Sequence, residues 1–173
     1  MAKLRKAVAY RTLERPYTRI SKFRKKSYIR VKPHIKIARF DIGDAKKAFE
    51  YSVDLISQAG IQVRQEAIES ARQTSVRLME KKLGKMPFHL KIRIYPYHIL
   101  RENPLAAGAG ADRMSTGMAH SFGKPIGVAA QIKKGQKVFT ISVDRQFVDV
   151  AKQALKRASK KMPCSFTIRI NRN

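Results

Sequence analysis

The stretch FHLKIRIY, residues 88–95, decides the fold class, because its apolar and polar side chains alternate along its whole length. The apolar side chains at positions 88, 90, 92 and 94 would point to one face of a strand. The opposite face carries Lys91 and Arg93. The alternation therefore predicts a strand with one core face and one basic face.

Further strands and helices are predicted on both sides of this stretch. Alternation predicts strands in HIKIARFD (34–41) and EYSVDLISQ (50–58), and helical apolar spacing predicts a helix from Gln62 to Leu83, ended by Gly84. GVAAQI (127–132) and KVFTISV (137–143) flank KKGQ and predict a β-hairpin. Asp144 is the expected N-cap of a second helix, which Pro163 closes before a last strand, CSFTIRI (164–170).

This order of elements predicts an α+β fold with two strand–helix–strand units on one mixed sheet. We expect a single α+β domain over residues 34–173, preceded by a basic RNA-binding arm over residues 1–33. A long glycine-rich loop, residues 101–127, projects from the middle of the chain.

The charge balance is the strongest compositional signal. Among 173 residues, 38 are Lys or Arg and 12 are Asp or Glu, which gives a net charge of +26 and a pI near 10.8. Self-repulsion of this size works against compactness, so it implies a polyanionic partner, most simply nucleic acid. The single Cys164 fits a reducing compartment, and no apolar run approaches the length of a membrane span. We expect a soluble, intracellular protein without a membrane partner.

The N-terminal arm combines cations with tyrosines. Residues 1–36 hold thirteen Lys or Arg and one acid, Glu14. Basic runs are often disordered tails, but interleaved aromatic rings offer stacking on bases or sugars and favour an arm that orders on RNA. The candidate RNA-binding residues are Arg11, Arg15, Tyr17, Arg19, Arg24, Lys25, Lys26, Tyr28 and Arg30, together with Lys91 and Arg93 on the strand.

The central loop, RENPLAAGAGADRMSTGMAHSFGKPIG (101–127), contains five of the nine glycines and follows no helical or strand period. A mobile surface loop is one interpretation. Leu105, Met114 and Phe122 are too apolar for a solvating linker, however, and glycine lets a partner approach the backbone closely. We therefore favour a loop that orders against a partner.

Several blocks of the chain resemble one known family. HILREN, AGAGADR, TGM and SFGKPIG, with ERPYTR (14–19), KSYIR (26–30), KIARFDIG (36–43) and AIESAR (67–72), are similar in order and content to the archaeal and eukaryotic "L ten e" family of large-subunit ribosomal proteins, called "L sixteen" in bacteria. Val31, Tyr97 and Ala119 depart from the pattern of that family.

The resemblance implies a structural constituent of the large ribosomal subunit, cytoplasmic and without cofactor. It implies binding to large-subunit rRNA near the tRNA cleft, the peptidyl transferase region and the 5S rRNA side. Neighbouring ribosomal proteins and late assembly factors would be partners, and the loop would approach the acceptor end of tRNA. The loop residues that this implies are Arg101, Gly108, Gly110, Asp112, Arg113, Gly117 and Lys124.

Catalytic patterns are weak. GAGADR and GMAHSFGK only approximate phosphate-binding glycine motifs, and no metal-ligand cluster occurs in the sequence. His98 or His120 could act as a general base with Glu102 or Asp112 in an RNA-processing enzyme. A general RNA- or DNA-packaging protein is the other alternative. We expect no enzyme.

Overall fold

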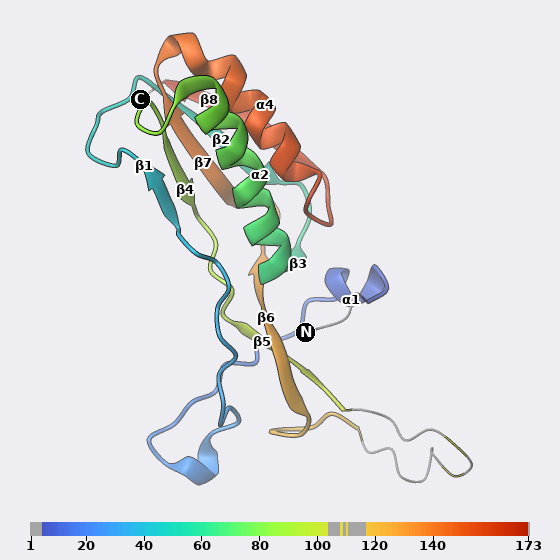
Figure 1. Cartoon of the computed structure of the whole chain (residues 1–173). Coiled ribbons are helices and arrows are strands. Elements are labelled where there is room, and N and C mark those ends of the chain that lie inside the picture. The colour runs from blue at the N-terminus through green and yellow to red at the C-terminus, as the bar shows by residue number, and fades with distance from the viewer. Residues whose placement is uncertain (1–4, 104–107, 109, 111–116, 173) are drawn as a thin grey trace.

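A computed structural model describes residues 5–103, 108, 110 and 117–172 and shows an α+β fold with two antiparallel sheets (Figure 1). The elements, in chain order, are α1 (Val8–Arg11), η1 (Arg24–Lys26), β1 (Asp41–Gly43), β2 (Tyr51–Ser57), β3 (Ile61–Arg64), α2 (Gln65–Leu83), β4 (His89–Ile92), β5 (His98–Glu102), β6 (Lys124–Ile132), β7 (Lys137–Val143), η2 (Arg145–Phe147), α4 (Val148–Ser159) and β8 (Phe166–Arg172).

The larger sheet has the strand order β1-β4-β7-β2-β8, and α2 and α4 cover one of its faces (Figure 1). Alternation along β4 and its flanks is confirmed, because Phe88, Leu90, Ile92 and Ile94 are all buried. Leu55 of β2 and the helical residues of α4 complete this core. Full burial of each large apolar side chain stabilises the fold by about 1.5–3 kcal/mol.

The smaller sheet has the order β3-β6-β5 and extends away from the helices as a ribbon (Figure 1). At the outer end of the ribbon, Glu102 of β5 pairs directly with Lys124 of β6. A register shift between Leu100 and Arg101 interrupts this pairing. Such an irregularity bends a strand and changes the direction of the side chains beyond it.

The expected mixed sheet and the expected hairpin are wrong. Every described strand pair is antiparallel, and β6 and β7 belong to different sheets. The turn between them instead bonds to β2, since the Gly135 N–H donates to the Ser57 carbonyl at 2.8 Å. Alternation identified both strands but could not identify their partners, which lie far away in sequence.

Two strand boundaries also differ from the sequence interpretation. The predicted strand over 34–41 is wrong for residues 34–40, because β1 begins only at Asp41, although Ile37 is buried. Residues 62–64, predicted as the start of a helix, belong to β3, and the helix begins at Gln65. The strand immediately before α2 is therefore in the smaller sheet, while the strand after α2 is in the larger one.

The helix ends follow local chemistry in part. Gly84 ends α2 with a φ of +88°, a conformation that glycine adopts without strain. Asp144 was expected to cap the second helix, but its side chain makes no capping hydrogen bond. Its carboxylate instead pairs with the Lys47 ammonium at 2.7 Å, and η2 precedes α4.

Among the described residues, no helix combines the length and the apolar character that crossing a bilayer requires.

Candidate nucleic-acid interface

The basic arm lies against the edge of the smaller sheet. The Tyr17 N–H donates to Nδ1 of His98 at 2.8 Å, and the Ile99 N–H donates to the Tyr17 carbonyl at 3.3 Å. Ile29 is buried against Ile99 and Val128 in a small second core. The arm is therefore fixed to β5 by backbone bonds and by apolar burial.

Between residues 19 and 28 the arm turns back on itself. The Arg19 carbonyl accepts hydrogen bonds from the N–H groups of Tyr28 and Ile29 at 3.0 and 3.3 Å. The Ser27 hydroxyl bonds to both the N–H and the carbonyl of Ser21. This closed turn presents η1 at its end, where the Phe23 side chain is 67% exposed beside three consecutive cations.

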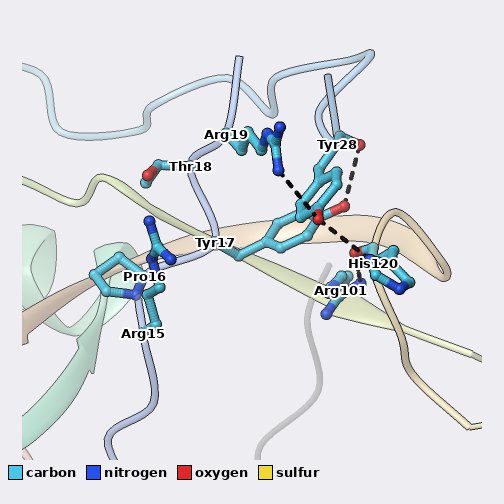
Figure 2. Close-up of a pocket in the computed structure, with 8 residues that line it drawn as sticks. All are labelled: Arg15, Pro16, Tyr17, Thr18, Arg19, Tyr28, Arg101 and His120. Atoms are coloured by element: carbon cyan, nitrogen blue, oxygen red, sulfur yellow. Dashed lines mark hydrogen bonds between the residues drawn. The ribbon is translucent and has the colours of Figure 1, made fainter. Parts of the chain in front are cut away.

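Two tyrosines and two arginines form a stacked cluster where the arm meets the ribbon (Figure 2). The rings of Tyr17 and Tyr28 are stacked with centroids 5.9 Å apart, and the Tyr17 hydroxyl donates to the Tyr28 carbonyl. The Arg101 guanidinium lies 3.9 Å from the centroid of Tyr17, and that of Arg19 lies 4.9 Å from the centroid of Tyr28. Cation–π contacts of this kind hold guanidinium planes parallel to rings and leave N–H donors at their edges.

The returning end of the central loop is attached to the same cluster. One Arg101 nitrogen, Nη1, donates to the carbonyls of His120 and Phe122, both at 2.7 Å. The Tyr28 hydroxyl lies 3.2 Å from Nδ1 of His120, as Figure 2 shows. His120 has a φ of +43°, unusual for a residue with a Cβ, and these bonds hold it there.

These contacts surround a cavity of about 460 Å³, which we call the arm–loop hollow. Its lining consists of Arg15, Pro16, Tyr17, Thr18, Arg19, Tyr28, Arg101 and His120. No acidic side chain is among these described residues. An adjoining cavity of about 600 Å³ is lined by Arg30, Gly117 and Phe122 among others. Guanidinium donors around exposed ring edges suit a phosphodiester with its sugar or base.

The two histidines have structural positions. Burial, with the charge of Arg101, lowers the pKa of His98 below its ordinary value of 6.5 and keeps the ring neutral, as an acceptor at Nδ1 must be. The alternative of a histidine acting with Glu102 gains no support, because the Glu102 carboxylate pairs with Arg5, and Asp112 lies outside the described residues. Among the described residues, no group of His, Cys, Asp or Glu side chains is arranged to hold a metal ion.

The predicted RNA-binding residues do not all lie together. Arg15, Tyr17, Arg19, Tyr28 and Arg101 line the arm–loop hollow, and Arg30 and Gly117 line the adjoining cavity. The other arm residues are outside both, with Arg11 at the end of α1 and Arg24, Lys25 and Lys26 in η1.

Lys91 lies on β4 of the larger sheet, with its ammonium 3.7 Å from the Asp41 carboxylate. Arg93 directly follows β4, and its guanidinium donates to the Thr140 hydroxyl.

The loop predictions are only partly described by the structure. Arg101 belongs to β5 and Lys124 to β6, so the connection between strands is shorter than the predicted 101–127. Gly108 and Gly110 have φ values of +124° and +80°, which glycine accommodates. Asp112 and Arg113 lie outside the described residues.

Sequence reasoning missed the link between the arm and the loop. Arg101 was assigned to a tRNA-proximal loop, His98 and His120 to a hypothetical enzyme, and Phe122 to apolar loop character. Their contacts join segments about 80 to 100 residues apart. No local pattern could have indicated this proximity.

Comparisons with known proteins agree with the motif resemblance. Residues 17–169 match the family described as ribosomal protein L16p/L10e. The "Large ribosomal subunit protein uL16" of Archaeoglobus fulgidus is 41% identical over 154 residues, which is 89% of this chain and 85% of the relative. The protein of the same name from Methanococcus maripaludis is 43% identical over 166 residues, covering 95% and 92% of the two chains.

Proposed function

The chain belongs to the ribosomal protein L16p/L10e family, and on that basis we propose that it is a structural constituent of the large ribosomal subunit, bound to large-subunit rRNA in the cytoplasm. The relatives from two archaea are both named as large ribosomal subunit proteins. Each of them aligns with this chain over most of its length. Family membership and the charge of +26 support the same partner, a polyanionic RNA.

The observation that carries the proposal is the arm–loop hollow. Three arginines, Arg15, Arg19 and Arg101, surround two stacked tyrosines. In the described part of the chain, none of these arginines forms an ion pair with a carboxylate. Phosphate oxygens would satisfy the free guanidinium donors, and ring edges would contact sugar or base. Arg30, at the adjoining cavity, extends this basic surface along the arm.

The finer proposal concerns the central loop. Arg101 and Tyr28 bond to His120, at the end of the loop that returns to the ribbon. RNA that binds the arm would therefore also fix the position of this end of the loop. We propose that the loop thereby approaches the acceptor end of tRNA near the peptidyl transferase region. The same proposal places the chain on the 5S rRNA side of the subunit. It also includes contacts with neighbouring ribosomal proteins and binding by late assembly factors.

The remaining candidates would contribute phosphate contacts at other places. Arg11, η1 with its three cations, Lys91, Arg93 and Lys124 are separate from the arm–loop hollow. Each phosphate that a cation neutralises adds about 0.7–0.9 to the slope of log affinity against log salt. The proposed mechanism is electrostatic binding to RNA phosphates and not catalysis. In this proposal RNA, and not this chain, catalyses peptide transfer.

The test is gradient sedimentation of cell lysate at rising salt, following the chain across fractions. Arg15, Arg19 and Arg30 are changed together to Gln, and a control changes three exposed lysines near the end of α2, Lys81, Lys82 and Lys85. We expect the arm variant to leave the large-subunit fraction at lower salt than the control. Wild-type chain found at the top of the gradient, or distributed over DNA, would refute the ribosomal proposal.

A second experiment tests the proposed role of the central loop. Deleting residues 105–121 should leave the chain in large-subunit fractions, because the arm and both sheets remain. Translation or late maturation of the subunit should nevertheless be impaired. Normal growth and normal polysomes in the deletion strain would contradict the proposed role of the loop.

A further inference from the structure

We propose that β8 and α4 form a docking groove for an extended, acidic segment of a protein partner, which adds to the larger sheet as a further strand. Strand β8 is one edge of that sheet, and among the described strands it pairs only with β2. All seven of its residues are in unbroken register with β2. In the part of the chain that the structure describes, no segment pairs with the other side of β8.

A long regular edge of this kind presents a row of unpaired N–H and C=O groups to its surroundings. Another chain can pair with such an edge through its main chain, and the pockets beside it then select the side chains of the added strand. The regularity matters here because the β2–β7 pairing contains a shift, whereas the β2–β8 pairing does not. The edge is therefore suited to accept a strand of similar length.

The groove beside this edge is both apolar and basic. A cavity of about 330 Å³ lies between α4 and β8, lined by Lys152, Gln153, Lys156, Ile168 and Ile170. Ile168 and Ile170 lie opposite Leu55 and Val53, which are fully buried on the helical side of the sheet. Ile170 is nevertheless 41% exposed, because no strand beyond β8 in the described chain covers it.

The lysines set the charge of the partner. Lys152 and Lys156 are one helical turn apart and so lie on the same side of α4. Lys152 pairs with Asp149 at 3.0 Å, but the Asp149 side chain is 85% exposed, so this surface pair is weak and can exchange. β8 itself contains arginines and no acid. An added strand that carries both apolar residues over the isoleucines and carboxylates beside the lysines, on its face toward α4, would satisfy both features.

Charge also argues against a second copy of this chain as the occupant. Pairing two β8 edges would place arginines of two strands opposite each other in molecules that each carry +26. RNA would satisfy the lysines but would supply no main-chain partner for the strand edge and no aliphatic cover for Ile170. An acidic protein segment is the occupant that uses the backbone, the isoleucines and the lysines together.

The first experiment uses the full-length chain and two synthetic peptides of equal length and charge. One is a strand-forming peptide that places Val and Glu in turn at the positions facing the groove, with Thr at the positions between them, and the other has the same number of Glu among Gly and Pro, which cannot form a strand. Hydrogen exchange is followed at the amides of residues 166–172. At ten times its dissociation constant, the strand-forming peptide should slow exchange at every second amide about tenfold. Equal effects of both peptides, or no effect of either, would overturn the proposal.

A matched substitution keeps this measurement specific. Ile170→Lys should abolish the slowing by removing the apolar cover and adding like charge, while Ile170→Val should retain it. Because Ile170 is partly exposed, melting of both variants should remain close to that of the parent. Slowing that survives in Ile170→Lys would place the peptide elsewhere and refute the groove.

The second experiment identifies the class of partner in cells. A photo-crosslinking residue replaces the exposed Gln153, and a control replaces the exposed Gln73 on α2. The expected adduct is specific to position 153, is destroyed by protease, resists nuclease, and maps to an acidic peptide with alternating apolar residues. A nuclease-sensitive adduct would assign the groove to RNA, and an adduct with another copy of this chain would assign it to self-association; either result overturns the proposal. The adduct is informative wherever the chain sediments, so its failure is distinct from failure of the ribosomal proposal.

Discussion

Replacing Arg101 with Met should detach the returning end of the central loop from the arm while leaving the core folded. The substitution removes two hydrogen bonds of 2.7 Å to the carbonyls of His120 and Phe122, and a guanidinium 3.9 Å from the Tyr17 ring. In this partly exposed position the two charge-assisted bonds together contribute about 2 kcal/mol, and the cation–π contact about 0.5–1 kcal/mol. The combined loss of about 2.5–3 kcal/mol raises the open population about 70- to 160-fold.

Hydrogen exchange resolved by residue measures this directly. Amides of residues 117–123 and 17–19 should exchange faster in Arg101→Met, whereas amides of β2 and β7 should be unchanged. Arg101→Lys serves as the matched control, because it keeps the charge but lacks the planar fork, and should produce an intermediate effect. Unchanged exchange over 117–123 in the Met variant would refute the proposed attachment, and equal acceleration in β2 would show that the effect is global.

Three further substitutions test the core, the buried polar network and the histidine. Leu55→Ala, at a fully buried position, should lower the free energy of unfolding by about 2–5 kcal/mol in urea titration, whereas Val8→Ala, 61% exposed, should have little effect. Asp54→Ala should lower the free energy of unfolding by about 2–4 kcal/mol in the same assay, because it leaves the buried Thr140 hydroxyl without its 2.7 Å acceptor. A loss below about 1 kcal/mol, the value of a surface ion pair, would contradict this. Since the folded pKa of His98 is lowered, neutral His98 stabilises the arm above pH of about 6.5, and this contribution is lost as pH falls below that value. Arm protection in hydrogen exchange should therefore weaken at acidic pH in the wild type but not in His98→Gln, and equal pH dependence in both would exclude His98 as the cause.

Much of the larger sheet could be predicted from sequence because its strands carry one buried and one polar face. Alternation along 88–95 identified β4 and the correct core residues, and helical spacing identified α2 and α4. The period of a strand reports which face is buried. It does not report which strand lies beside it, and this is why β6 and β7 were joined in a hairpin that the structure does not contain.

The sequence predicted which types of residue form the candidate site, but not how they are brought together in space. Cations and tyrosines in the arm indicated nucleic acid, and Tyr17, Arg19 and Tyr28 do line the arm–loop hollow. The contribution of Arg101 and His120 depends on β5, a strand of only five residues, of which Arg101 and Glu102 were interpreted as loop and residues 98–100 were assigned to no element. Short strands with mixed side chains, such as β3 and β5, carry too little periodicity to be distinguished from their surroundings.

The direct pairing of Glu102 with Lys124 has a consequence for how this protein can change over evolutionary time. The ladder brings both ends of the connecting segment together whatever lies between them, so insertions or deletions there leave the register of β5 and β6 intact. Doubling the length of a flexible connection costs only about 0.6 kcal/mol in closure entropy. The register of β5 and β6 therefore places no limit on the length of the segment between these two residues, so any limit on its length or sequence comes from the partner that it contacts.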